Sequence, residues 1–149
     1  MITLFILLGG YGILYVFSRL GVLPATSSNE ELAAWAMAFF LFFFGLSHFY
    51  KFRDLLRIVP SWVPYPQQTV YLTGVLEILF AFGLLIPSLR FAAGIAVVLF
   101  FIAVFPANLN KAIHRIHVPG TLSTTVLSWV RLAYQPLFIL WTLYCIDAL

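Results

Sequence analysis

Apolar residues gather in five long segments along the chain, separated by short polar or proline-rich breaks. Each segment is close to the roughly 20 residues that cross the hydrocarbon core of a bilayer. The segments are Ile2–Val22, Leu32–Tyr50, Gln68–Ile86, Leu89–Leu109 and Val130–Ala148. This pattern predicts an all-α integral membrane protein whose residues 1–149 form a single helical bundle.

The breaks between the segments have different causes. Pro24–Glu31 is a polar turn in which Ser28 or Asn29 can cap the next helix. The prolines of Pro60–Pro66 forbid a continuous helix, and Pro87 makes the third and fourth segments a hairpin. In KFRDLLRIV, apolar residues recur at i, i+3, i+4 and i+7, which predicts a short helix lying on the membrane surface.

Composition strengthens the assignment to the membrane. The chain is 63% hydrophobic and only 9% charged, whereas a soluble domain carries about 25% charged residues. Its net charge of +3 comes without a basic tract, so nothing favours nucleic-acid binding. The single Cys145 excludes an intramolecular disulfide. His114 and His117 lie three apart but lack further ligands, so we expect no metal site.

Lysine and arginine are distributed unevenly between the two sides of the predicted bundle. The side that holds residues 51–67 and 110–131 carries six of them, and the opposite side carries two, Arg19 and Arg90. The positive-inside rule then predicts a cytoplasmic N-terminus and an external C-terminus. The first segment lacks a basic n-region and is longer than the usual apolar stretch of a signal peptide, so we expect a retained helix.

Glu77 is the most informative residue, because it lies near the middle of the apolar segment VYLTGVLEILFAFGLLIP. An acidic residue at the centre of a membrane helix costs roughly +2.5 to +3.5 kcal/mol on insertion scales. Thr73 and Gly74 share its helical face. We therefore expect the Glu77 carboxyl to face the bundle interior, where it either bonds to neighbouring helices or handles a ligand, proton or substrate.

Other polar side chains fall in the same half of the membrane as the lysine- and arginine-rich side. They come from four predicted helices and are His48, Tyr71, Asn108 and Gln135. Convergent polar groups between apolar walls are typical of a binding site. These residues and Glu77 predict a ligand pocket opening near the Pro60–Pro66 loop, with the first helix outside it. The Phe39–Phe44 run is interpreted mainly as lipid-facing or core packing.

From about Ala38 to Trp141 the chain resembles the DoxX-like family of small bacterial membrane proteins. The matching stretches, in order, are FFGLSHFYKF, IVPSWVPYP, VYLTGVLEILFAFGLLIP, VFPANLNKAIH and RLAYQPLFILW. The resemblance implies an antiparallel four-helix bundle over about residues 32–149 in the bacterial inner membrane. Residues 1–23 are then an extra N-terminal transmembrane helix. Some DoxX relatives are linked to thiosulfate oxidation with quinone, others to redox-stress complexes or membrane-protein chaperoning.

Three functions fit these observations. The first is binding of a quinone-like molecule or lipid in the cytoplasm-facing pocket, as a redox accessory subunit with a membrane or redox protein partner. The second is an assembly factor or structural subunit without catalysis. The third is a membrane enzyme that uses Glu77 and His48 as an acid–base pair on a lipid. No motif specifies a reaction, so the sequence leaves open whether the protein is an enzyme.

Overall fold

The computed structural model describes residues 2–22, 28–116 and 125–148. Within these ranges the chain forms helices and no strands. The helices are α1 (Ile2–Arg19), α2 (Asn29–Tyr50), α3 (Phe52–Leu56), α4 (Pro66–Leu85), α5 (Arg90–Ile113) and α6 (Thr125–Cys145). The predicted all-α membrane bundle is confirmed.

The helices that could span a membrane are α2, α4, α5 and α6. Among the described residues, these four helices are long and apolar enough to cross a membrane, and α1 is a shorter apolar helix. The chain is therefore a multi-pass membrane protein. The N-terminal segment that the sequence predicts as an extra membrane helix corresponds to this shorter helix.

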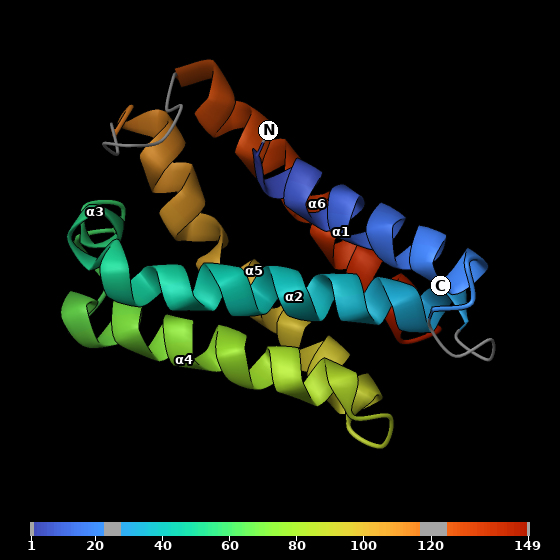
Figure 1. Ribbon diagram of the computed structural model, residues 1–149. Helices are drawn as coiled ribbons and strands as arrows, with labels where there is room; N and C mark the ends of the chain where they lie inside the picture. The colour runs from blue at the N-terminus through green and yellow to red at the C-terminus, as the bar shows by residue number, and fades with distance from the viewer. Residues whose placement is uncertain (1, 23–27, 117–124, 149) are drawn as a thin grey trace.

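The four long helices close into a ring around a common core. Helix α2 packs on α4, α4 on α5, α5 on α6, and α6 on α2. Helices α2 and α4 run antiparallel side by side, and α1 lies against α2 on the side away from α4 (Figure 1). Leu7 of α1 is buried, and Tyr11 meets the ring of Trp141 on α6 edge-on. Helix α1 thus flanks the ring, as expected.

Aromatic rings fill much of the core. Phe40 contacts Phe44 and Phe138, and Phe101 contacts Phe138, so α2, α5 and α6 meet through these rings. Phe39, Phe42 and Phe43 are exposed on the outside of the bundle. The phenylalanine run therefore serves both the core and the lipid-facing surface, in agreement with its interpretation from the sequence.

Helix α4 has two faces that differ in residue size and polarity. Its outer face carries exposed apolar side chains, Leu72, Val75, Leu79 and Phe82. Its buried face carries Val70, Gly74, Glu77, Ala81 and Leu84. These buried positions recur every three or four residues, as one side of an α-helix requires. The most polar residue of the helix therefore faces inward, away from the hydrocarbon.

The helix ends agree only partly with the sequence predictions. The Ser28 side chain caps α2 by accepting a hydrogen bond from the Glu31 backbone N–H at 3.2 Å. A helix forms where the sequence predicts a short surface helix, but α3 ends at Leu56, and α5 continues four residues beyond the predicted end at Leu109. His117 lies outside the described residues.

Candidate functional site

A close approach of two helix backbones builds the site. Gly45 of α2 and Gly74 of α4 face each other, and both are buried. A Cβ atom added to Gly74 would lie 2.6 Å from the His48 Cβ and 3.0 Å from the Gly45 carbonyl oxygen. A Cβ atom on Gly45 would lie 2.9 Å from the Gly74 oxygen. Only glycine at both positions allows α2 and α4 to come this close.

This contact brings His48 beside Glu77. Nε2 of His48 lies 3.5 Å from Oε2 of Glu77. On the other side of the ring, Nδ1 lies 3.0 Å from the Val70 carbonyl oxygen and 3.0 Å from Oγ1 of Thr73. A carbonyl oxygen only accepts hydrogen bonds, so Nδ1 carries a hydrogen and the ring is fixed with Nε2 toward Glu77.

Glu77 retains unused hydrogen-bonding capacity. Its side chain is 12% exposed, and its Oε2 atom is buried with no hydrogen-bond partner among the described residues. The 3.5 Å separation from His48 permits electrostatic attraction but lacks the alignment of a hydrogen bond. A buried polar atom of this kind calls for an explanation, and a bound ligand is one.

The pair has a defined chemical capability. Nδ1 of His48 already carries a hydrogen. One further hydrogen between Nε2 of His48 and Oε2 of Glu77 can be donated by either atom and accepted by the other. Imidazole and carboxyl groups are the common proton carriers of proteins. The pair can therefore hold a proton, or present a donor and an acceptor to a polar group that reaches it.

Asn108 and Gln135 form a second polar pair, between α5 and α6. Nδ2 of Asn108 donates to Oε1 of Gln135 at 3.4 Å, and Nε2 of Gln135 donates to the Phe101 carbonyl oxygen. Pro106 lies within α5 between these two points and deprives that helix of one backbone hydrogen bond. Among the described residues, no hydrogen bond or ion pair joins this pair to His48 or Glu77. Its side chains cross-link two helices beside a proline.

Tyr71 occupies a different environment from the other candidates. Its side chain is 45% exposed, and its ring stacks on Phe52 of α3 at 4.5 Å and also contacts Phe49. It joins the surface helix to the bundle. The structure thus gathers the candidates as two pairs and one outer residue. Gly45 was not singled out from the sequence, although its pairing with Gly74 sets the His48–Glu77 contact.

Metal ligands do not cluster in the part of the chain that the structure describes. No group of three or more His, Cys, Asp or Glu side chains there is close enough to hold an ion. His114 follows the end of α5 as its C-cap residue, so the helical face that would continue toward His117 ends before it.

Residues 37–146 match the family described as "Domain of unknown function (DUF8561)". The chain belongs to this family. The match to DUF8561 runs from within α2 to the end of α6, so it includes both polar pairs and excludes α1. No curated protein and no solved structure matches the chain.

Proposed function

We propose that this membrane protein binds a small, flat, apolar molecule with a hydrogen-bonding oxygen, of the quinone class, at the Glu77–His48 pair. The observation that carries the proposal is the buried Oε2 of Glu77, which has no hydrogen-bond partner among the described residues beside Nε2 of His48. A quinol hydroxyl donates to a carboxyl oxygen, and a quinone oxygen accepts from a protonated imidazole. The pair matches both forms of such a ligand.

The resemblance to DoxX-like proteins supports a redox accessory role in a bacterial inner membrane. The motifs that carry it include FFGLSH, which ends at His48, and VYLTGVLE, which ends at Glu77. These two stretches meet at the Gly45–Gly74 contact. The side chains of the described residues offer no redox centre of their own. In this proposal a membrane or soluble redox partner therefore supplies or removes the electrons.

An assembly factor or structural subunit is the second candidate. The Asn108–Gln135 pair favours it, because these amides, Gln135 buried and Asn108 half-buried, bond within the bundle and to its backbone. Their role is complete without a ligand. If Glu77 has the same kind of role, its carboxyl serves a client helix or a neighbouring subunit instead of a small molecule.

Ligand binding separates the two candidates. Purified protein titrated with ubiquinone-1 or menadione by calorimetry is expected to bind. Glu77→Gln should weaken binding about tenfold, because a neutral amide replaces the carboxyl, a difference of roughly 1.4 kcal/mol. Ser47→Ala is the matched control. Ser47 is the residue before His48, and its hydroxyl donates a hydrogen bond to the Phe44 carbonyl oxygen.

The outcomes of this titration are distinct. Equal binding by the Glu77→Gln and Ser47→Ala variants would contradict a site at Glu77. Absence of binding by the unaltered protein, together with co-purification of a stoichiometric protein partner, would favour the assembly role. Extraction and mass spectrometry of the purified protein should identify a quinone that survives purification.

Orientation in the membrane is a separate proposal, N-terminus inside and C-terminus outside. Lys51 follows α2 and Lys111 lies near the end of α5, at the same end of the bundle, whereas α6 ends at the opposite end. The positive-inside rule places the lysine-rich end in the cytoplasm. A C-terminal alkaline phosphatase fusion should be active and a C-terminal green fluorescent protein fusion dark. The reverse pattern would overturn the orientation.

A further inference from the structure

A shallow cavity, largely open to the outside, lies at the end of the bundle opposite Lys51 and Lys111. Its volume is about 490 Å³, within the usual range for small-molecule sites. It is bordered by the start of α2, the turn between α4 and α5, and the end of α6. Because these are the ends of membrane-spanning helices, the cavity lies at the depth where lipid headgroups meet the hydrocarbon.

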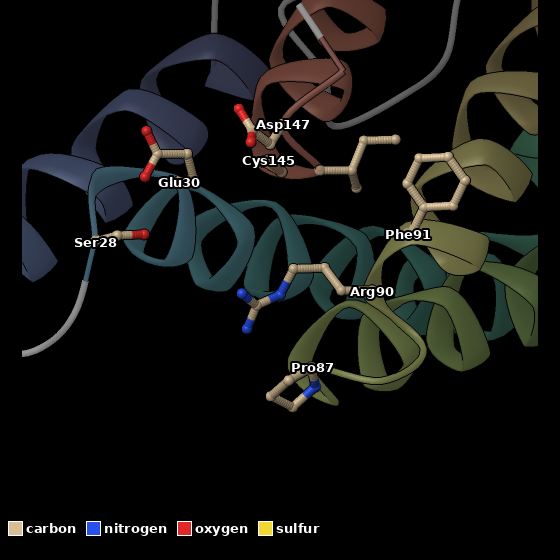
Figure 2. A pocket seen from close by; sticks show the side chains of 8 residues that line it. Ser28, Glu30, Pro87, Arg90, Phe91, Cys145 and Asp147 are labelled. Atoms are coloured by element: carbon tan, nitrogen blue, oxygen red, sulfur yellow. The ribbon is translucent and has the colours of Figure 1, made fainter.

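Opposite charges line different sides of this cavity. The carboxyl groups of Glu30 and Asp147 come from α2 and from the residues after α6, while the Arg90 guanidinium extends from α5 toward α2 (Figure 2). Glu31 lies beside Arg90, with its Oε1 3.7 Å from Nη2. The local charges therefore sum to a negative value, which disfavours a purely anionic ligand.

Arg90 is only partly satisfied by the protein. Its Nε donates to the Leu84 carbonyl oxygen at 3.0 Å, which fixes the side chain across the α4–α5 turn. Nη2 is buried and has no hydrogen-bond partner among the described residues. The 3.7 Å separation from Glu31 is too long for a hydrogen bond. The Arg90 side chain as a whole is 18% exposed, so a ligand in the cavity meets the accessible part of the guanidinium group rather than Nη2. A phosphate oxygen is a common partner for such a group.

Apolar side chains continue from the cavity to the outer surface. Phe91 lines the cavity and is 63% exposed, and Ile86 and Leu89 on the adjoining turn are 45% and 49% exposed. Acyl chains can lie against this surface while a headgroup occupies the polar part.

We propose that the cavity binds the headgroup of a zwitterionic phospholipid that carries a primary amine, such as phosphatidylethanolamine. The phosphate bonds to Arg90, and the ammonium donates hydrogen bonds to Glu30 and Asp147. A trimethylammonium headgroup has no N–H to donate, and a glycerol headgroup has no positive charge. The site therefore discriminates among lipids by the amine. It is separate from the Glu77–His48 pair and does not depend on its function.

Native mass spectrometry with lipids of identical acyl chains tests the proposal. Detergent-purified protein is offered equal amounts of phosphatidylethanolamine, phosphatidylcholine and phosphatidylglycerol. We expect about a tenfold preference for phosphatidylethanolamine, the effect of one or two charge-assisted hydrogen bonds. The double variant Glu30→Gln/Asp147→Asn should reduce this preference to about twofold or less.

Control variants separate the site from general lipid binding. Arg19→Gln removes a cation at the same end of the bundle but outside the cavity, where Arg19 bonds to the Tyr15 hydroxyl, and it should keep the preference. Arg90→Gln should weaken binding of all three lipids. Thermal unfolding of each variant checks that it is folded. If Arg90→Gln is not folded, the double variant Glu30→Gln/Asp147→Asn supplies the decisive comparison.

The remaining outcomes count against the proposal. Equal binding of the three lipids by the unaltered protein, or a preference that survives the Glu30→Gln/Asp147→Asn change, would overturn it. Excess glycerophosphoethanolamine should fail to displace the lipid, because it lacks the acyl chains. Displacement by this soluble compound would overturn the lipid assignment in favour of a water-soluble zwitterion.

Discussion

Gly74→Ala is expected to destabilise the bundle by about 1–3 kcal/mol, the usual cost of overpacking a close-packed interface. The new Cβ would meet the His48 Cβ at 2.6 Å and the Gly45 oxygen at 3.0 Å. Neither neighbour is the free end of a flexible side chain, so α2 and α4 must move apart. Reversible unfolding of the detergent-solubilised protein by sodium dodecyl sulfate measures the change.

Gly9→Ala in α1 is the matched control for this substitution. A Cβ added at Gly9 has no neighbouring atom within 4 Å. Alanine is favoured over glycine in a helix interior by about 0.5–1 kcal/mol, so this variant should be neutral or slightly stabilised. If the two variants unfold at the same denaturant concentration, the Gly45–Gly74 contact does not hold the helices together.

Glu77→Leu is expected to cost about 1–3 kcal/mol, because it leaves Nε2 of His48 without the polar group that faces it. Glu77→Gln keeps a polar group at this position and should be tolerated much better. Glu77→Gln should nevertheless weaken quinone binding, so this variant separates the effect of the carboxyl on binding from its effect on stability. Thermal unfolding in detergent compares the two variants.

A double-mutant cycle with His48→Leu isolates the interaction between the two side chains. If Glu77→Leu destabilises the protein because the His48 imidazole loses its polar neighbour, this destabilisation should largely disappear in the His48→Leu background. A Glu77→Leu protein that melts at a higher temperature than the unaltered protein and still binds its ligand would show that the carboxyl is neither a structural partner nor a contact.

Helix number and the inward direction of Glu77 were predictable from the sequence for clear physical reasons. Apolar runs long enough to span a bilayer allow few other structures, because unpaired backbone groups are costly in hydrocarbon. On α4, the spacing of Gly74 and Glu77 puts both on one face, and the structure buries both. The carboxyl had to face protein, and it does.

The sequence named His48 as a candidate contact of Glu77, but the inner face of α2 was less predictable, because its central residues 32–46 hold no charged, amide or hydroxyl side chain. Phe39 and Phe40 are neighbours of the same type, yet one is 59% exposed and the other 5%. In a membrane, lipid and core are equally apolar, so hydrophobic periodicity does not distinguish them. The residue that marks the inner face of α2 is Gly45, and it is informative only together with Gly74 on α4.

For Tyr71, the depth of the residue along its helix and the surroundings of its side chain are separate predictions. Its sequence position put it near one end of α4, and its spacing of six residues from Glu77 turns it roughly 120° away from the buried face. What packs on its ring depends on α3, whose Phe52 stacks on it. Arg90 was counted from the sequence only as a charge. Its contacts with Leu84 and Glu31 depend on how the α4–α5 turn meets the start of α2.

The Gly45–Gly74 contact also restricts how α4 can move along α2. The two backbones touch only where both residues lack a Cβ, and bulkier residues flank that point on each helix, such as Ile78 on α4. Gradual sliding would press these side chains into the opposite backbone. One turn from either glycine the chain carries side chains, Leu41 and Phe49 on α2 and Val70 and Ile78 on α4. A shifted register therefore finds no second pair of glycines, so the contact holds His48 and Glu77 in a single register.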